Sequence, residues 1–515
     1  MPTSSTTCLT ATRKGRCKLQ FILCGVLLAT QLLDPTTSLY AQRTDLFLPT
    51  VPAAKVIING SRHYQTMDGF GMSEAFGQAN SVRGLSSSAQ KQILDTFFSI
   101  SKGAGFTILR NLLPSDTPNT IEPKDPGGPN ATPQYQWNPN DPGESEGQVW
   151  LSKQAWKIYK VKQFYLDAWS APGYMKTTGT ENNGGALCGV PEASCPSGDW
   201  RRAYANYLVQ YIRDYQKEGI PISYIGPVNE PGFKTGYSSI DMTPAQAADF
   251  DAVLAKALHS AFPDPKLRPH IVCCDPVGWG QAQGYADALA SNDSVQVISS
   301  HGYGGAPNFP LTGISHKHTW ETEWGTLNDQ WNASWDDGGD GSGFAWTQHI
   351  YDGLAKANLS AFLYWWGSAV GDSNDAVLIR YTNNTLEISK RLWAFANYSR
   401  FVRPGAIRIG ATASDKNLET TAFKNTDGSF ALVIFNISHS DISTTFSLQN
   451  TSITPNCVVT PYLTNDSNNT TRQARLRIQQ QKFSTTVLAR SLVTYQVSCH
   501  TSGVEKPHAK KLSMT

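Results

Sequence analysis

The sequence predicts an α/β fold in which a (β/α)8 TIM barrel carries an attached antiparallel β-sandwich side domain. Its 515 residues exceed what a single hydrophobic core usually organises. Eight short apolar, β-branched or aromatic stretches between about residues 65 and 395 alternate mostly with stretches of helical spacing, which favours the barrel. The chain then changes to alternating strands divided by Asn, Ser and Thr turns, which is typical of a sandwich.

The eight expected barrel strands share apolar or aromatic residues and end in glycine, proline or polar residues. They lead into the segments 69–73, 107–110, 163–169, 223–228, 270–275, 295–300, 319–323 and 361–366. The clearest helix candidates between them are 88–98, 199–218 and 244–261. Little sequence separates the sixth and seventh strands, so the helix there is expected to be short or absent.

These patterns divide the chain into five parts. They are a secretory signal peptide at 1–41, an N-terminal segment at 42–64, the barrel at 65–395, the sandwich at 396–502 and a flexible tail at 503–515. The segment 54–59 has the composition of a strand and is expected to join the sandwich, which makes the second domain discontinuous.

The amino terminus has the layout of a secretory signal. Basic residues from Arg13 to Lys18 precede an apolar stretch from Leu19 to Leu33, and small and polar residues follow up to Ala41. A signal anchor is the alternative, but the apolar stretch is shorter than the roughly 20 residues of a spanning helix and contains polar residues. We therefore expect a cleaved signal, a secreted, extracellular protein and no membrane attachment after cleavage.

Cysteine usage indicates the same compartment. Removal of the leader leaves an even number of cysteines, which fits disulfides: Cys188, Cys195, Cys273, Cys274, Cys457 and Cys499. The first two are close enough to clip a local loop, and the last two are placed to tie the ends of a carboxyl-terminal sheet. The adjacent pair in the middle has no assigned connectivity. Zinc is the weaker alternative there, because no Cys-x-x-Cys or Cys/His spacing accompanies the pair.

The charge balance excludes some classes of partner, and the glycosylation sequons indicate secretion. Charge is nearly balanced, at 43 Lys and Arg against 41 Asp and Glu, so nucleic acid and acidic polymers are poor candidates. Sequons occur at Asn130, Asn332 and Asn397 and in the cluster from Asn465 to Asn469, and their density fits a secreted glycoprotein.

Two glutamates stand where strand-like stretches break into loops of glycine, proline and aromatic residues. Glu230 lies within 226–231 and Glu323 within 319–325. Carboxylates that end separate strands of a parallel barrel converge on one mouth, and the fourth and seventh strands face each other there. Cleavage of a glycosidic bond needs a proton donor and a carboxylate at the anomeric carbon. The pair therefore predicts a retaining glycoside hydrolase.

Neighbouring polar residues have expected supporting roles. Asn229 is placed to donate to a sugar hydroxyl next to the reacting carbon. Glu321 and Glu74 are the rivals of Glu323 for the second carboxylate. Alternation along the strand puts Glu321 on the same side as Glu323 but about one layer deeper, where support is the expected role.

Three further polar residues near the predicted strand ends are candidates for the site. Arg110 either holds the nucleophile ionised or is a structurally paired arginine inside the barrel. His301 is either a hydrogen-bonding residue of the site or a structural histidine. Ser73, at the end of the first strand, is expected to contact substrate.

Aromatic residues are concentrated at the predicted strand ends. Sugars present apolar C–H faces that stack on rings, and Trp169, Tyr303 and Trp365 are the stacking candidates. Four other aromatic residues share this location: Tyr174, Trp279, Trp324 and Trp366.

Five motifs together resemble glycoside hydrolase family 30, over nearly all of the mature chain. They are Asp68-Gly-Phe-Gly71 and the segments 168–176, 228–231, 320–323 and 389–396. The stretches 184–200 and 399–405 look most like the fungal xylanase branch, subfamily 7. The resemblance implies a barrel with a side sandwich and a retaining mechanism, with Glu230 as acid/base and Glu323 as nucleophile.

The same resemblance implies β-1,4-xylosidic bonds in xylan or glucuronoxylan of the plant cell wall as substrate. Relatives that recognise glucuronic acid branches use basic residues near the mouth. Gln78 stands where such a residue is expected, so plain xylan and xylooligosaccharides stay open as substrates. The alternatives are a β-1,6-glucanase or β-1,6-galactanase of the same family, and a non-catalytic polysaccharide-binding wall protein.

Cofactor and metal motifs do not stand out in the sequence. We expect no cofactor and no metal, full activity in the presence of a chelator, and a monomer.

Overall fold

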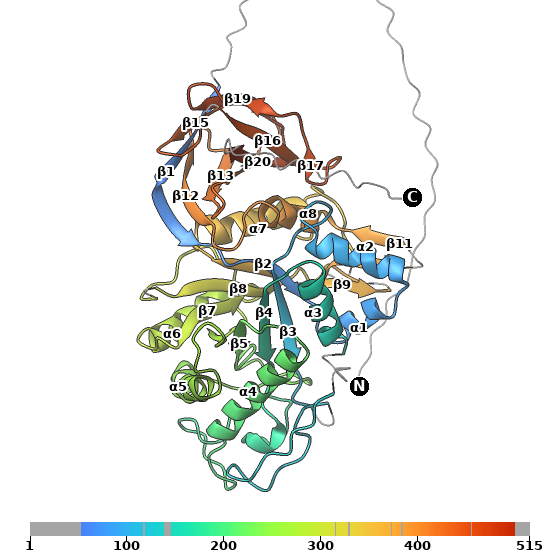
Figure 1. Cartoon of the computed structure of the whole chain (residues 1–515), viewed down its shortest axis with the longest axis vertical. Helices are drawn as coiled ribbons and strands as arrows, with labels where there is room; N and C mark the ends of the chain where they lie inside the picture. Colours follow the sequence, from blue (N-terminus) through green and yellow to red (C-terminus); the bar gives the residue numbers. More distant parts are fainter. Residues whose placement is uncertain are drawn as a thin grey trace, which may run out of the picture. The chain divides into compact units, whose positions relative to one another are not determined.

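The computed structural model describes residues 53–116, 119–138, 146–314, 316–327, 330–371, 373–382, 385–454 and 456–499. These ranges hold a closed barrel and a second, mostly antiparallel sheet (Figure 1). The expected signal peptide and carboxyl-terminal tail lie outside them. None of the helices in these ranges combines the length and apolarity of a membrane span.

The barrel consists, in the described chain, of eight parallel strands that pair in chain order and close through β8 and β9. They are β2 (Gly69–Ser73), β3 (Ile108–Leu113), β4 (Gln163–Ala168), β5 (Tyr224–Gly226), β6 (His270–Cys273), β7 (Val295–His301), β8 (His318–Trp324) and β9 (Ala361–Val370). Almost every residue of β2, β3 and β4 is buried, because helices and the barrel interior cover both faces of a parallel sheet. The predicted TIM barrel is confirmed.

Helices cover the outside of the barrel. They are α1 (Gln78–Arg83), α2 (Ser87–Phe98), α3 (Gln148–Lys157), α4 (Arg201–Lys217), α5 (Pro244–Ala261), α6 (Trp279–Leu289), α7 (Gly343–Ala355) and α8 (Lys390–Ser399). The clearest predicted helices correspond to α2, α4 and α5. At the start of α5, Thr243 and Gln246 form a capping box, and Pro244 occupies the first turn. Between β7 and β8 the described residues form no helix, as their short spacing predicts.

The barrel interior is filled by side chains from alternate strands. Tyr165 on β4, Tyr224 on β5 and Trp320 on β8 pack edge to face there, and Trp320 lies 4.5 Å from Tyr224 between ring centroids. This layer makes a solid floor below the carboxyl ends of the strands. Two short strands, β10 (Val377–Thr382) and β11 (Thr385–Ile388), extend the sheet beyond β9 and were not among the predicted strands.

The second sheet takes strands from both ends of the described chain. Its strands are β1 (Ala54–Thr66), β12 (Ile407–Ala413), β13 (Leu418–Lys424), β14 (Phe430–Asn436), β15 (Ile442–Gln449), β16 (Cys457–Thr464), β17 (Thr471–Arg472), β18 (Leu476–Arg477), β19 (Lys482–Val487) and β20 (Ser491–Cys499). β1, blue in Figure 1, lies between β12 and β15. The sheet curls so that Phe446 on β15 reaches Tyr495 on β20, with ring centroids 4.9 Å apart. The predicted sandwich is confirmed.

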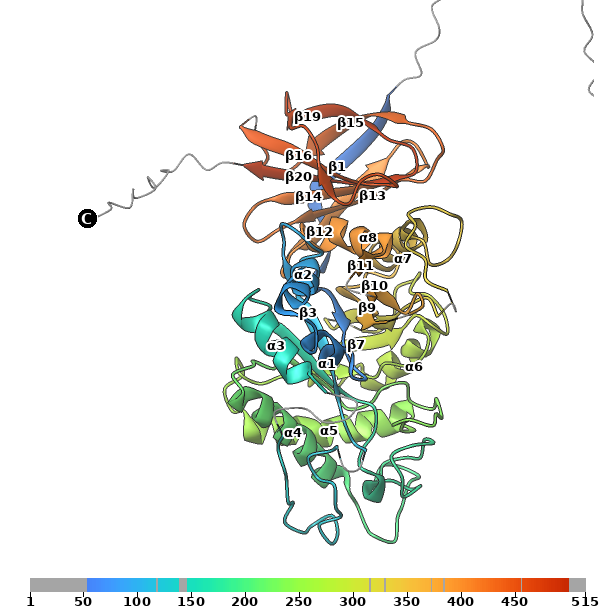
Figure 2. The same cartoon turned by 90° about the vertical axis from the view of Figure 1, so that its right-hand side faces the viewer.

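The barrel and the sandwich meet at α7 and α8 (Figure 2). Phe344 on α7 packs against Phe435 on β14, and the Trp335 indole donates to the Arg490 carbonyl at 2.6 Å. α8 runs across the expected boundary between residues 395 and 396, and the first sandwich strand after it begins at Ile407.

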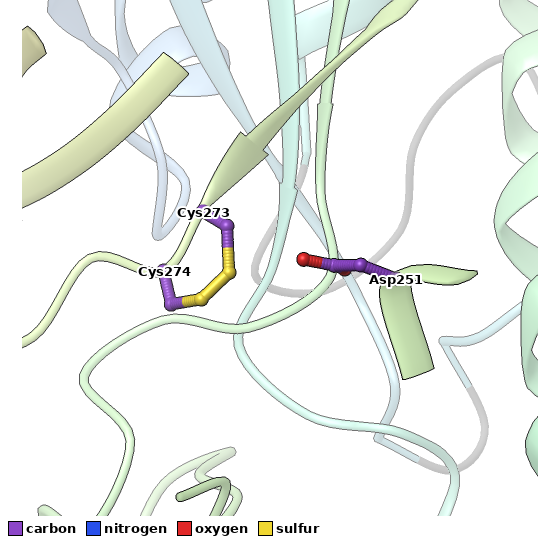
Figure 3. A group of neighbouring side chains, drawn as sticks. All are labelled: Asp251, Cys273 and Cys274. Carbon is purple, nitrogen blue, oxygen red and sulfur yellow. A yellow bond between two sulfur atoms is a disulfide. The ribbon is translucent and has the colours of Figure 1, made fainter. Parts of the chain in front are cut away.

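Three disulfides are present among the described residues. Cys188–Cys195 closes a short loop, and Cys457–Cys499 joins β16 to β20, as expected. The adjacent residues Cys273 and Cys274, at the end of β6, are bonded to each other (Figure 3).

Candidate active site

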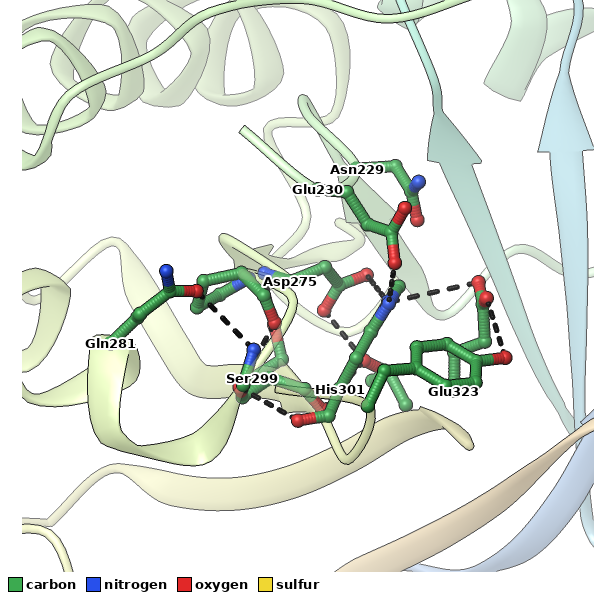
Figure 4. A network of polar contacts seen from close by, with 12 residues as sticks. Asn229, Glu230, Asp275, Gln281, Ser299, His301 and Glu323 are labelled. Carbon is green, nitrogen blue, oxygen red and sulfur yellow. Dashed lines mark hydrogen bonds and ion pairs between the residues drawn. The ribbon is translucent and has the colours of Figure 1, made fainter. Parts of the chain in front are cut away.

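Polar side chains from consecutive strands converge at the carboxyl end of the barrel. They are Arg110 on β3, Asp167 on β4, Asn229 and Glu230 after β5, Asp275 after β6, His301 at the end of β7 and Glu323 on β8. Parallel strands direct the residues at their carboxyl ends to one mouth, so residues far apart in sequence become neighbours. Figure 4 shows His301 between Glu230 and Glu323, with contacts to both.

Glu230 and Glu323 lie close enough to act on one bond. Glu230 is 8% exposed and Glu323 is 5% exposed. One carboxylate oxygen of each, together with a ring nitrogen of His301, lie within 4.8 Å of one another. A separation of roughly 5–5.5 Å between carboxyl groups is typical of retaining glycosidases, whereas inverting enzymes need roughly 6.5–9.5 Å. The geometry therefore fits direct attack by one of the two carboxylates.

Glu323 is surrounded by hydrogen-bond donors. The Arg110 guanidinium donates to Oε2, and the Tyr303 hydroxyl donates to Oε1 at 3.1 Å. Burial is the largest effect and raises the pKa of Glu323 overall; the charges of His301 and Arg110 oppose the rise, and the charge of Glu230 adds to it. Donors that favour the ionised form are what a carboxylate nucleophile requires.

Arg110 is the hub of the site. Its Nη2 donates to Asp167 at 2.6 Å, to Asn229 at 2.5 Å and to Asp275 at 3.3 Å, in addition to the Nη1 contact with Glu323. The side chain is fully buried. Both interpretations left open by the sequence therefore describe it, because it pairs with interior carboxylates and also contacts Glu323.

His301 is a second cation of the site. Its Nδ1 lies 3.0 Å from Glu230 Oε1, and its Nε2 lies 3.7 Å from Glu323 Oε2 and 3.9 Å from Asp275. Burial opposes the charged ring, but Glu323, Asp275 and Glu230 together outweigh it and raise the pKa of His301 to about 10. The imidazolium thus donates to Glu230 at neutral pH.

Asp275 connects the backbone of Glu230 to the arginine. The Glu230 amide donates to the Asp275 carbonyl at 3.0 Å, and the Asp275 carboxylate accepts from Thr322 at 2.6 Å and Tyr165 at 2.9 Å. Both residues of this backbone hydrogen bond have left-handed backbones, with φ of 46° at Glu230 and 52° at Asp275. Such conformations cost roughly 1 kcal/mol each or more, so surrounding contacts must hold them.

The two rival glutamates lie elsewhere. Glu321 is fully buried on β8, and its Oε1 accepts from the Glu323 amide at 3.0 Å, so it supports the loop end as expected. Glu74 is fully buried and accepts from Ser368 at 3.3 Å. Burial raises the pKa of both carboxyls.

The predicted aromatic residues divide into two groups. Trp169 and Trp365 lie 6.1 Å apart between ring centroids, and both contact Phe76, which was not predicted. The guanidinium of Arg110 lies 4.5 Å from the centre of the Trp169 ring, which links this aromatic cluster to the site. Tyr303 contributes its hydroxyl to Glu323.

Other residues predicted for the site make their contacts with other parts of the protein. Trp279 is fully buried and donates to the Phe309 carbonyl at 2.8 Å, and Trp324 packs against Trp346. Ser73 is buried at the end of β2, where its hydroxyl accepts from the Ala75 amide at 3.3 Å.

Asp167 and Asp275 were missed in the sequence, although both lie at the ends of predicted strands. Burial and the charge of Asp275 raise the pKa of Asp167, while Arg110 opposes the shift. Burial opposes ionisation of Asp275 too, but His301 and Arg110 lower its pKa overall. The rule that found Glu230 and Glu323, a polar residue where a strand breaks, also applies to these two aspartates.

A divalent cation does not suit the triad of Glu230, His301 and Glu323, despite its compact geometry. Metal binding requires a neutral imidazole, whereas the raised pKa of His301 keeps its ring protonated. Arg110 already supplies positive charge to Glu323.

Comparison with curated proteins finds relatives of varied activity. A lysosomal acid glucosylceramidase of Mus musculus is 24% identical over 425 residues, which are 75% of this chain and 78% of the relative. A glucuronoxylanase of Bacillus subtilis is 26% identical over 305 residues, 58% and 66% of the two chains. An endo-1,6-beta-D-glucanase of Aspergillus fumigatus is 24% identical over 414 residues, 76% and 82%.

Both domains match one family. The profile of the Glycosyl hydrolase family 30 TIM-barrel domain matches residues 67–262, and that of the Glycosyl hydrolase family 30 beta sandwich domain matches residues 405–495. The solved catalytic domain of GH30 xylanase C from Talaromyces cellulolyticus is 40% identical and covers 86% of this chain and 100% of its own, with a TM-score of 0.80. Agreement over both domains and at this identity shows that the chain belongs to glycoside hydrolase family 30.

Proposed function

We propose that this glycoside hydrolase cleaves β-1,4-xylosidic bonds in xylan by double displacement, with retention of the anomeric configuration. The observation that carries the mechanism is the approach of Glu230 and Glu323 to within 4.8 Å between carboxylate oxygens. That spacing leaves too little room for the water that an inverting enzyme places between its carboxylates.

The surroundings of the two carboxylates support distinct roles. Glu323 accepts from Arg110 and Tyr303, and both donors favour its ionised, attacking form. Glu230 is then the acid that protonates the leaving oxygen and the base that activates water in the second step. Asn229, whose side-chain oxygen is fixed by Arg110, is placed beside Glu230 for contact with the sugar.

The substrate assignment is supported by the fungal xylanase structure at 40% identity. Phe76 and Trp365 are partly exposed and pack against the buried Trp169, and they offer apolar surface to a neutral sugar chain. Gln78, the first residue of α1, stands where a glucuronate-binding base was expected, so we propose that glucuronic acid branches are not required.

The nucleophile is tested by Glu323→Gln. The amide cannot attack the anomeric carbon, so kcat should fall by roughly 10⁴-fold or more on every substrate. Initial rates are measured on glucuronoxylan, arabinoxylan, β-1,6-glucan and β-1,6-galactan, and the exposed Glu192→Gln serves as matched control. Full activity of the Glu323 variant would falsify the mechanism, and absence of xylooligosaccharides from every xylan would remove the substrate assignment.

A β-1,6-glucanase is the second candidate, favoured by the 24% identical Aspergillus fumigatus relative. Release of glucose oligomers from β-1,6-glucan, with no product from xylan, would establish it. A non-catalytic wall protein would bind polysaccharide and release no reducing sugar from any of the four substrates.

We also propose that the protein acts outside the cell after removal of residues 1–41. Three disulfides in the described chain and the sequons support an oxidising, extracellular compartment. Sequencing the amino terminus of the protein recovered from culture medium tests this, and a mature chain that still begins at Met1 would contradict it.

A further inference from the structure

A buried carboxyl group lies beside the disulfide between adjacent cysteines. Asp251 is on α5, and Cys273 and Cys274 end β6. All three side chains are fully buried, and one carboxylate oxygen and both sulfur atoms lie within 4.8 Å of one another. Figure 3 shows the Asp251 carboxyl pointing toward the disulfide.

Asp251 lacks the partners that a buried carboxyl normally has. Neither of its oxygens has a hydrogen-bond partner among the described residues. Burial raises the pKa of Asp251 to about 8. A protonated carboxyl is therefore held within 4.8 Å of both sulfur atoms.

The disulfide adjoins the catalytic network. Asp275 follows Cys274 directly, and its carbonyl accepts from the Glu230 amide at 3.0 Å. Its carboxylate accepts from Arg110 at 3.3 Å, and Arg110 in turn contacts Glu323. The cysteine pair thus directly precedes Asp275, which bonds to the backbone of Glu230 and to Arg110, the donor to Glu323.

We propose that Asp251, Cys273 and Cys274 form a buried thiol–disulfide exchange site that is coupled to the catalytic pair through Asp275. A dithiol reductant attacks one sulfur as its thiolate, and the bond between Cys273 and Cys274 breaks. The second thiol of the reductant then closes its own disulfide and releases the other cysteine. Two electrons and two protons end on the cysteines, and Asp251 passes a proton to a departing thiolate and takes it back on oxidation.

One oxygen of Asp251 lies within 4.8 Å of both sulfur atoms, so the carboxyl is placed to exchange a proton with either departing thiolate. Because the three side chains are fully buried, exchange requires local opening between α5 and β6 and is slow. Reduction removes the covalent tie before Asp275 and loosens the hydrogen bonds that hold Glu230 and Arg110. The expected consequence is a lower kcat with little change in KM, because the disturbed groups act in the chemical step.

The coupling is tested on the full-length secreted protein with dithiothreitol. At intervals one portion of the sample is alkylated, and the state of each disulfide is read from it by peptide mass spectrometry. In a second portion, which is not alkylated, kcat is measured. We expect kcat to fall roughly 10- to 100-fold in step with alkylation of Cys273 and Cys274, and not with that of the other two pairs. Oxidised glutathione added to the reduced protein that has not been alkylated should restore kcat. Full kcat in protein reduced at this pair, with an unchanged near-UV circular dichroism spectrum, overturns the coupling.

A double variant, Cys273→Ala with Cys274→Ala, provides an independent test. It should have the low kcat from the outset and should not respond further to reductant, apart from any effect of the other disulfides. Wild-type kcat in this variant overturns the coupling, and if the variant fails to fold the reduced wild-type protein decides alone.

Asp251→Asn tests the proton exchange, because asparagine has the same shape and cannot transfer a proton. Its disulfide form should retain kcat within about twofold of wild type, while re-oxidation of the pair slows about tenfold. If the pair re-oxidises at the wild-type rate in Asp251→Asn, then Asp251 takes no part in the exchange.

The alkylation and re-oxidation readouts need no substrate, so they stand even if xylan proves not to be the substrate. The measurement of kcat rests on the proposed hydrolase function and uses whichever polysaccharide the enzyme cleaves.

Discussion

Two buried cations organise the carboxylates of the site. Arg110 contacts Asp167, Asp275 and Glu323, and the imidazolium of His301 lies between Glu230 and Glu323. Each charged group is buried, so its ionisation depends on its neighbours rather than on solvent. The charges of these groups therefore depend on one another, and removing either cation raises the pKa of Glu323, which both of them contact.

Replacing His301 with glutamine should shift the acidic limb of the pH profile. The imidazolium charge lowers the pKa of Glu323, so its loss raises that pKa. If Glu323 is the nucleophile, as proposed, it must be ionised, and activity is lost as pH falls through its pKa. The acidic limb of kcat/KM in His301→Gln should therefore move to higher pH by about one unit or more.

The control for this variant is Tyr303→Phe, which removes a neutral donor to Glu323 and leaves the charge in place. It should shift the limb less than the His301 variant does. If His301→Gln keeps the wild-type acidic limb while its kcat changes, then His301 does not act through its charge on Glu323.

At the scale of elements, the strand ends set the geometry of the site. Gly226 ends β5, and a Cβ there would overlap the Asp167 carboxylate and the Tyr165 hydroxyl. Glycine thus lets β5 approach β4 closely, and it leaves room for the ion pair between Asp167 and Arg110. Strand spacing and catalytic electrostatics depend on the same residue.

Gly226→Ala should therefore impair both stability and catalysis. We expect a loss of about 1–3 kcal/mol in the free energy of unfolding, together with a fall in kcat. Urea unfolding and steady-state kinetics measure the two effects. Gly280→Ala on α6 is the control, because its Cβ meets open space and should stabilise the helix by about 0.5–1 kcal/mol. Equal behaviour of the two variants would contradict this interpretation.

The sequence predicted the elements better than the contacts between them. Apolar runs such as 163–169 identified the barrel strands, because strands buried on both faces are nearly continuously hydrophobic. β11 has only four residues, too few for a periodic pattern. The pairing of Arg110 with Asp167 and Asp275 depends on strand neighbours in space, which residue spacing does not encode. The bond between Cys273 and Cys274 was likewise left open by spacing.

At the scale of the whole described chain, a buried polar cluster joins the barrel to the sandwich. Asn397 on α8 donates to Thr470 at 3.3 Å and also to Thr464 of β16. The Thr494 hydroxyl on β20 donates to the Asn397 carbonyl at 2.5 Å. Asn397 begins a predicted glycosylation sequon, but its side chain is fully buried and its amide nitrogen is engaged, so a glycan does not fit there in the folded protein.

Asn397→Ala should remove the side-chain hydrogen bonds to Thr464, Thr470 and Thr494, leave a small cavity and destabilise the junction. The expected loss is about 1–3 kcal/mol in the free energy of unfolding, seen as a lower Tm in calorimetry. The exposed sequon residue Asn130 is the control, and Asn130→Ala in deglycosylated protein should change stability by no more than about 0.5 kcal/mol. A glycan found on Asn397 by glycopeptide mapping would contradict the burial of the Asn397 side chain.

In the proposed mechanism two carboxylates, delivered by separate strands, act on one sugar through a covalent intermediate. The most direct measurement is proton NMR of the sugar released in the first minutes of hydrolysis, before mutarotation mixes the anomers. Attack by Glu323 followed by attack of water predicts that β-linked substrate yields the β-anomer first. Initial appearance of the α-anomer would show a single inversion and contradict the account.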